Sequence, residues 1–211
     1  MNSHVHTPAN FLQQIRFCAL VGTDAEIRDN VIWGRWKDPP RTFYGLPRGR
    51  LLVEEFLNWA SDNKSILRFI CRFGPLYESP HSPVKEFGVN LVFWSRWKKS
   101  VRELWENLME GPQDAFEFES AVDNAVLSYA NRKFELRVAY LETFMHLELA
   151  SCDRRKLRKC LAPDCATPYF VARHLGQRYC DEKCAKWAQS KWKKEWWAVH
   201  GNKWRKEHSN S

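Results

Sequence analysis

The chain has 211 residues, of which 44% are hydrophobic, 14% aromatic and 27% charged, and its net charge is +8. This composition fits one or two globular domains with a real core, and the longest apolar stretches fall far short of the roughly 20 residues of a membrane span. The opening residues MNSHVHTPAN are polar and lack the pattern of a signal peptide, so we expect a soluble, cytoplasmic protein.

The first fifty residues contain apolar runs that Pro39-Pro40 and other turn residues divide into short elements and loops. Apolar residues at helical spacing then predict helices at residues 51–61, 63–73 and 89–110, with a Pro/Ser-rich loop between 77 and 88. The N-terminal part is therefore expected to be mainly helical.

The apolar period changes in residues 126–141, where hydrophobic and polar side chains alternate, so a β-hairpin is predicted there. A last helix, within residues 142–159, is expected to lead into the C-terminal part. The predicted fold class is mainly α with a small β-hairpin, an α+β chain.

The excess positive charge lies in the C-terminal quarter of the chain. From residue 154 onward there are 15 Lys/Arg and 5 Asp/Glu, whereas the first 153 residues hold 18 basic and 20 acidic residues. This asymmetry indicates a polyanionic partner for the C-terminal part alone, with nucleic acid the leading candidate. We expect two domains, residues 1–153 and residues 154–211.

Four of the seven cysteines lie within 25 residues of one another, with the spacing C-x4-C-x14-C-x3-C. In a reducing compartment clustered cysteines are more typical of metal ligands than of disulfides. The spacing therefore predicts one structural Zn²⁺ ion bound by Cys160, Cys165, Cys180 and Cys184. Four thiolates leave no open coordination position, so this zinc would not be catalytic.

The local sequence predicts how these thiols meet. Residues 169–171 read as a strand, His174–Gln177 as a turn, and residues 177–179 as the return toward Cys180. Cys180 and Cys184 are four apart at the start of a helix, so they share one face. The expected result is a treble-clef-like zinc finger. Three alternatives stay open: His174 or His200 replacing one cysteine, four ordinary cysteines, and redox-active thiols.

A helix is predicted from residue 181 to His200, with Gly201 as its stop. One arc of this helix is apolar and is expected to face the zinc hairpin or the N-terminal domain; it carries Cys184, Ala185, Ala188, Trp192, Trp196 and Val199. Trp192 and Trp196 are therefore expected to be core residues.

The other arc interleaves lysines with tryptophans, a pattern that suits phosphate contacts and base stacking. The predicted nucleic-acid-binding residues are Lys186, Trp187, Lys191, Lys193, Lys194 and Trp197, together with Arg173 and Arg178 on the zinc hairpin. An alternative of equal weight is that Trp187 and Trp197 contact the N-terminal domain or another protein. The chain would then be a zinc-stabilised protein–protein interaction module.

No motif for catalysis is present: the sequence lacks GxGxxG, GxxxxGK[ST], GxSxG and HExxH. Glu142, His146 and Glu148 are close in sequence on one predicted helix, but no further group completes a site, so we interpret them as a polar edge. We do not expect an enzyme. The N-terminal domain is expected to sense a small ligand or contact a partner protein.

The residues RKCLAPDCATPYFV and QRYCDEKC, with a basic helix behind them, resemble the CGNR-type zinc finger. SILRFICRFGPLYE and FWSRWKKSVRELWENL resemble, more loosely, the ABATE domain that precedes this finger in a family of bacterial transcription regulators. The resemblance implies zinc on the four clustered cysteines and DNA binding through the finger. The chain resembles a divergent member of this family, because Ala185-Lys186-Trp187 stands where the family has Gly-Asn-Arg and the second cysteine pair is one residue closer than usual.

Overall fold

The computed structural model describes residues 15–46, 50–59, 62–77, 85–111, 125–130 and 133–208. The chain divides into two compact units, Met1–Arg155 and Lys156–Ser211. We call them unit 1 and the finger unit. Among the described residues, no helix is both long enough and apolar enough to cross a membrane.

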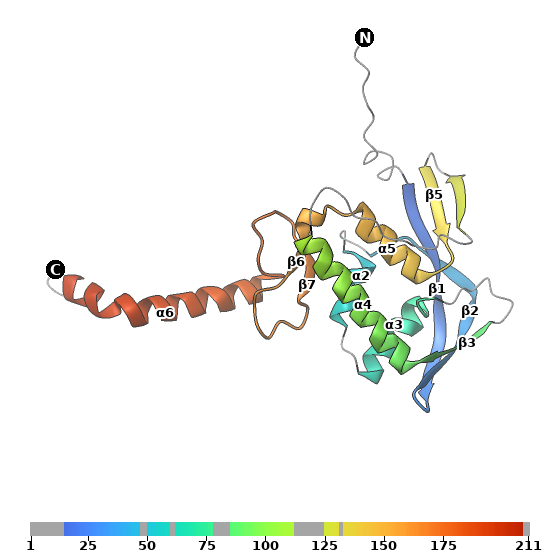
Figure 1. Ribbon diagram of the computed structural model, residues 1–211, viewed down its shortest axis with the longest axis horizontal. Helices are drawn as coiled ribbons and strands as arrows, with labels where there is room; N and C mark the ends of the chain where they lie inside the picture. The colour runs from blue at the N-terminus through green and yellow to red at the C-terminus, as the bar shows by residue number, and fades with distance from the viewer. Residues whose placement is uncertain are drawn as a thin grey trace, which may run out of the picture. The chain divides into compact units, whose positions relative to one another are not determined.

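Unit 1 is built on a five-stranded sheet whose order is β3-β2-β1-β5-β4 (Figure 1). Its strands are β1 (Ile15–Arg28), β2 (Val31–Phe43), β3 (Glu86–Asn90), β4 (Val126–Ala130) and β5 (Lys133–Val138). The β1–β5 pair is parallel and the other three pairs are antiparallel. The expected hairpin at 126–141 is present as β4 and β5, but it is one edge of a much larger sheet.

The prediction of a mainly helical N-terminal domain is therefore wrong. The first two strands form a long hairpin around Asp29 and Asn30, whose φ angles are 52° and 60°. Asp and Asn tolerate this left-handed conformation, and two such residues make the tight turn that matches the twist of a hairpin. The strand β3 also replaces the end of the expected loop at 77–88, and it pairs with β2.

Pro39-Pro40 led to the prediction of short elements and loops here, because proline usually interrupts a strand. In the structure the β1–β2 ladder jumps from Val21↔Arg41 to Thr23↔Trp36, so both prolines lie in a bulge of β2 where no ladder hydrogen bond is needed. Proline lacks an N–H group and is tolerated at such irregular positions. The strand thus continues on both sides of the prolines.

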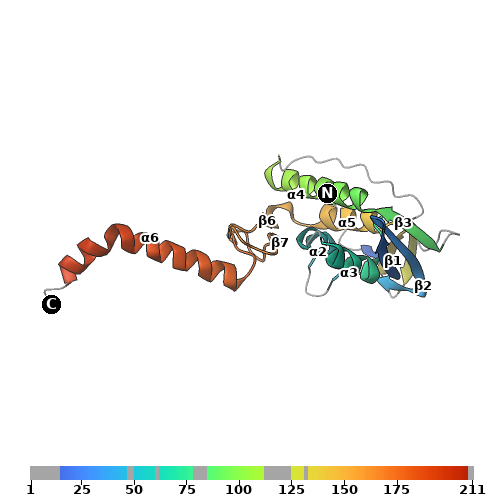
Figure 2. The ribbon, with the colours of Figure 1, turned by 90° about the horizontal axis from the view of Figure 1, so that it is seen from below.

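The described residues of unit 1 also form four helices, α2 (Leu52–Asn58), α3 (Asn63–Phe73), α4 (Leu91–Glu110) and α5 (Leu141–Ser151). Figures 1 and 2 show them stacked on one side of the sheet. Their apolar faces supply a core rich in aromatic rings, in which Phe69 contacts Phe56 and Trp94 at centroid distances of 5.4 and 5.6 Å. The predicted helices at 51–61, 63–73 and 89–110 correspond to the first three.

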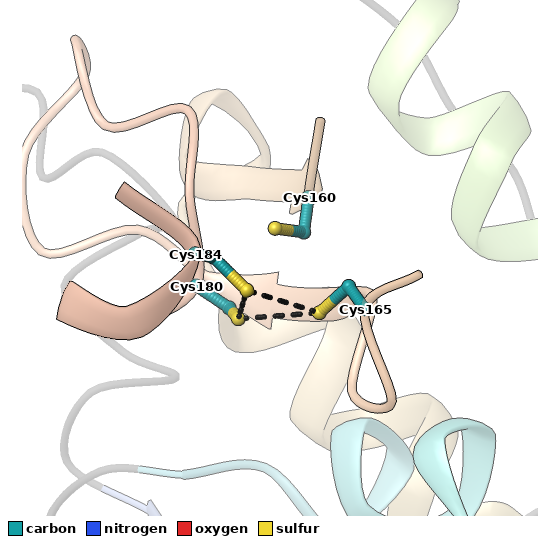
Figure 3. A group of neighbouring side chains, drawn as sticks. All are labelled: Cys160, Cys165, Cys180 and Cys184. Carbon is teal, nitrogen blue, oxygen red and sulfur yellow. Dashed lines mark hydrogen bonds between the residues drawn. The ribbon is translucent and has the colours of Figure 1, made fainter. Parts of the chain in front are cut away.

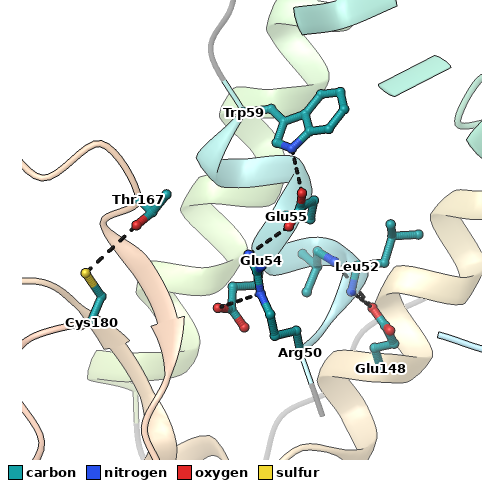
Figure 4. A network of polar contacts seen from close by, with 9 residues as sticks. Arg50, Leu52, Glu54, Glu55, Trp59, Glu148, Thr167 and Cys180 are labelled. Carbon is teal, nitrogen blue, oxygen red and sulfur yellow. Dashed lines mark hydrogen bonds and ion pairs between the residues drawn. The ribbon is translucent and has the colours of Figure 1, made fainter. Parts of the chain in front are cut away.

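Glu148 of α5 is buried and does not form the polar edge predicted for it. Its Oε2 accepts hydrogen bonds from the backbone N–H groups of Leu52 at 2.6 Å and Val53 at 3.3 Å, which ties α5 to the first turn of α2 (Figure 4). Arg50 binds Glu55 nearby, at 2.7 Å. Burial raises the pKa of Glu148 to about 8 and that of Glu142 to about 7.

The finger unit contains a short antiparallel pair, β6 (Leu157–Lys159) and β7 (Tyr169–Val171), and one long helix, α6 (Glu182–His208). The helix expected within 142–159 ends earlier, at Ser151, and a 3-10 turn at Arg154–Lys156 precedes β6. The strand that pairs with β7 is therefore β6, and not residues 177–179 as the sequence suggested.

Candidate metal centre and basic helix

Each of the four clustered cysteines is held in place by local backbone contacts. Cys160 directly follows β6, and its N–H donates to the carbonyl oxygen of Pro168 at 2.7 Å. The N–H of Cys165 closes a turn onto Ala162, at 3.3 Å. The segment before Cys180 lies beside the turn that carries Cys160 and Cys165, because the N–H of Leu161 donates to the carbonyl oxygen of Arg178 at 3.2 Å.

Cys184 lies in the first turn of α6, and Asp181 caps this turn. The Oδ1 atom of Asp181 accepts a hydrogen bond from the backbone N–H of Cys184 at 2.8 Å. An aspartate at this position satisfies one of the unpaired N–H groups of the helix start and favours the helix dipole. The cap therefore orients Cys184 while it begins the helix.

The four sulfur atoms all lie within 4.8 Å of one another. The Sγ–Sγ distances are 3.4 Å for Cys165–Cys180, 3.7 Å for Cys180–Cys184 and 3.7 Å for Cys184–Cys165 (Figure 3). Zinc–sulfur bonds of about 2.3 Å in a tetrahedron place two sulfur atoms about 3.8 Å apart. The cluster therefore has the dimensions of a four-thiolate metal site.

The closeness of the four thiol groups also favours binding of a cation. Burial and contact with the neighbouring thiols raise the pKa of Cys180 to about 12 and raise that of Cys184 as well. At Cys165 burial acts in the same direction, but hydrogen bonds from Cys180 and the backbone of Thr167 lower the pKa overall. Without a cation, four thiolates cannot coexist at this distance, whereas a bound metal ion keeps its thiol ligands deprotonated.

The neighbouring histidines do not join the cluster. His174 lies in the hairpin turn, where its carbonyl oxygen accepts from the N–H of Gln177 at 3.1 Å. His200 stacks on Trp196 within α6, at a centroid distance of 5.1 Å. Among the described residues, the group able to hold a metal ion consists of the four cysteines alone.

The four cysteines belong to a small apolar cluster of the finger unit. Cys160, Ala162, Phe170 and Ala172 are buried together, with Cys165, Tyr179, Cys180 and Cys184 against them. These side chains are few and mostly small, so they bury little apolar surface. Metal binding would therefore supply much of the folding free energy of this unit.

Helix α6 is longer than predicted, because it continues through Gly201 to His208. Gly201 makes room for a side chain instead of ending the helix: a Cβ atom at this position would lie 2.9 Å from the indole of Trp197. That indole contacts Trp204 edge to face, at 5.3 Å. The extension adds Trp204 and the basic residues Lys203, Arg205 and Lys206 to the helix.

At 100° per residue, six of the eight lysine and arginine side chains of α6 gather with three tryptophans in an arc of about 160°. This arc, called here the basic arc, comprises Lys183, Lys186, Lys191, Lys193, Lys194 and Arg205 with Trp187, Trp197 and Trp204. Glu182 and Glu195 fall outside it. The sequence reading missed Trp204 and Arg205 because the helix was expected to stop at Gly201, although lysine and tryptophan recur beyond it.

The lysines of the basic arc differ in their ion pairs. Lys186 binds Glu182 at 2.7 Å and Lys191 binds Glu195 at 3.9 Å, both across one helical turn. In the part of the chain that the structure describes, Lys183, Lys193 and Lys194 form no ion pair. These three ammonium groups are the ones available to an anionic partner without breaking an existing contact.

The tryptophans of the basic arc are exposed: 41% for Trp187, 37% for Trp197 and 43% for Trp204. The Nζ of Lys191 lies 5.5 Å from the ring centroid of Trp187, a cation–π arrangement. The arc expected to face a core is exposed as well, with Trp192 at 66% and Val199 at 74%. Trp192 is therefore not a core residue of the finger unit, because its helix projects beyond the small hairpin (Figure 1).

Arg173 and Arg178 are both exposed and lie on the hairpin side of the finger unit. The backbone N–H of Arg173 donates to Oε1 of Gln177 at 2.8 Å, which shapes the turn after β7. Both arginines contribute positive charge to the finger unit, but neither is part of α6.

Comparisons with family models, with curated proteins and with solved structures found no match to this chain.

Proposed function

We propose that this chain is a zinc-finger protein that binds nucleic acid, DNA in particular, through the basic arc of α6. The observation that carries the proposal is this arc: it is free of acidic residues, and it combines three lysines without ion pairs with three exposed tryptophans. Lysines neutralise phosphates and aromatic rings stack on bases, so this combination suits a nucleic-acid strand.

In this proposal the four cysteines hold one zinc ion, which is structural. The thiolate-only ligand set and the tetrahedral spacing favour zinc, and four protein ligands complete its coordination. Cys184 would connect the ion directly to the first turn of α6. The metal would thus order the hairpin and the start of the helix that presents the basic arc.

The resemblance to the ABATE and CGNR-type family supports a role as a transcription regulator, which is part of this proposal. Unit 1 would then receive a small ligand or a partner protein. An open pocket of about 620 Å³ on unit 1, lined in part by Trp33, Arg28, Arg35 and Glu26, offers a place where such a ligand could bind.

The test is a DNA-binding titration across salt with the zinc-loaded full chain. Lys193→Glu with Lys194→Glu should weaken binding and should reduce the slope of log K against log salt by about two, since each lost phosphate contact removes about one. Lys203→Glu with Lys206→Glu is the matched control, because it reverses the same charge on the same helix outside the basic arc.

Equal losses in the two double variants would contradict the assignment to the basic arc. Absence of binding at about 50 mM salt would overturn the proposed function itself. RNA of the same sequence serves as the second ligand, and tighter binding of RNA would correct the choice of DNA.

The second candidate function is a zinc-stabilised protein–protein interaction module. The observation that favours it is the exposure of Trp192 and Val199 on the side of α6 opposite to the basic arc. Large apolar side chains grouped on one face are typical of a protein interface. Under this alternative, Trp192→Asp would abolish partner binding while the salt titration with nucleic acid stays flat.

A further inference from the structure

A pocket of about 360 Å³ lies beside the cysteine cluster within the finger unit. Its lining includes Pro163, Asp164, Cys165, Asp181, Lys183 and Trp187. Ligand pockets usually have volumes of about 300–1,000 Å³, so this one is sized for a single small planar group and not for a duplex. Cys165 and Cys184 both line it, so a metal ion bound to them would make this side of the pocket rigid.

Trp187 is shared between this pocket and a second one of about 390 Å³. Lys191, whose ammonium group lies over the indole, lines only the second pocket. Lys183 lines the first pocket, but among the described residues it makes no cation–π contact with this indole. An exposed indole at the edge of a small pocket is suited to stacking against one base.

The carboxylates and the lysine that line the pocket differ in charge, so they would favour different parts of a nucleotide. Asp181 uses Oδ1 for the helix cap, whereas Asp164 forms no hydrogen bond or ion pair with any described residue. Carboxylates accept hydrogen bonds and repel phosphates, so they favour the amino edge of a base. Phosphates are instead attracted to Lys183 at the rim and to Lys193 and Lys194 farther along α6.

We propose that this pocket binds one unpaired base of a single-stranded segment, stacked on Trp187, with Asp164 accepting a hydrogen bond from an exocyclic amino group. This inference rests on the proposed function and names its substrate class: a strand with an unpaired cytosine, adenine or guanine. Thymine has no exocyclic amino group and presents a carbonyl oxygen at the corresponding position, which Asp164 repels.

The experiment measures binding of (dC)12, (dT)12 and a blunt 12-base-pair duplex to the zinc-loaded full chain, by fluorescence anisotropy at one salt concentration. The chain should bind (dC)12 more tightly than (dT)12. Trp187→Ala should weaken binding of (dC)12 by about tenfold or more, since stacking one base on an aromatic ring contributes that much. It should weaken binding of the duplex by a smaller factor, because paired bases are not free to stack on the indole. Asp164→Asn should reduce the preference for (dC)12, because its amide group also donates to a carbonyl oxygen.

Trp192→Ala is the matched control, because Trp192 is an exposed tryptophan of the same helix outside both the basic arc and this pocket. The inference is overturned if Trp187→Ala binds (dC)12 like the unchanged chain while the Lys193/Lys194 double variant is impaired; the proposed function then stands. If no variant binds more weakly than the unchanged chain, or if the unchanged chain binds none of the three ligands, both the inference and the proposed function are overturned. Asp164→Asn keeps the test decisive if Trp187→Ala fails to fold, since an unchanged preference for (dC)12 contradicts the proposed hydrogen bond.

Discussion

Glu148 illustrates at the scale of single residues how burial changes the chemistry of a common side chain. It is buried between α5 and the start of α2, and its carboxyl group has two backbone N–H partners from Leu52 and Val53. Burial penalises the ionised form more than these hydrogen bonds favour it, so the pKa rises to about 8. At neutral pH the folded chain therefore holds a proton here that the unfolded chain releases.

Stability should consequently fall as the pH rises. The folded pKa lies above the unfolded value of 4.5, so the folded state binds more protons between these two values. The free energy of unfolding should decrease through pH 5 to 8, with a slope of up to about 1.4 kcal/mol per pH unit. Glu148→Gln keeps an acceptor for Leu52 and should flatten this dependence, measured by urea unfolding at several pH values.

Glu142→Gln provides the comparison. Burial raises the pKa of Glu142 to about 7, so this variant should flatten the profile over a narrower range that ends nearer to pH 7. A Glu148→Gln profile as steep as that of the unchanged chain would show that Glu148 is ionised in the folded state.

At the scale of elements, Gly74 links the end of α3 to the sheet. Its φ angle is +99°, and its N–H donates to the carbonyl oxygen of Ile70 at 2.7 Å, which closes the helix. A Cβ atom at Gly74 would lie 2.5 Å from the ring of Trp36 on β2. The same glycine thus permits the helix end and the close approach of a strand.

Gly74→Ala should destabilise unit 1 for both reasons, by about 1–3 kcal/mol for the backbone conformation and by a similar amount for the overlap with Trp36. Gly22→Ala is the matched control: its φ angle is +112°, but its nearest neighbour is an atom of Lys37 at 4.0 Å. Only the backbone cost applies there. In chemical denaturation, the free energy of unfolding of Gly74→Ala should therefore be lower than that of Gly22→Ala. Equal losses of stability in the two variants would contradict the packing role of Trp36.

At the scale of the whole molecule, the two units are stabilised by different means. Unit 1 has a large aromatic core, in which Phe69, Phe73 and Trp105 are fully buried. The finger unit buries few side chains outside its cysteine cluster, and α6 is exposed along most of its length. A unit of this size with so little core would depend on a metal ion bound to the four cysteines to fold.

Cys184→Ser should therefore lower the zinc content and unfold the finger unit while unit 1 stays folded. Zinc is measured by atomic emission, and the helical signal by circular dichroism, which should fall because an isolated helix of this kind is marginal in water. Cys71→Ser, a change outside the cluster, should leave the zinc content unchanged. A metal-free variant with a folded tail would refute the structural role of the ion.

Several parts of this protein follow from local sequence alone. The spacing of four cysteines predicted the cluster, since thiols at short separations on a turn and a first helical turn are brought together by local geometry. Apolar periodicity located α2, α3 and α4, because a helix needs only contacts within its own segment. The lysine and tryptophan pattern also placed most of the basic arc, apart from the turns beyond Gly201.

The five-stranded sheet was decided only by tertiary structure. Ile15 pairs with Phe134 across more than a hundred residues, and no local pattern in either segment encodes that partner. The prolines of β2 became tolerable only because the ladder bulges around them, and the protonation of Glu148 depends on α2 lying against α5. Helices and the turns that carry the clustered cysteines form through contacts between residues that are close in sequence. Sheets, buried charges and the exposure of Trp192 depend on segments that meet only in the folded molecule.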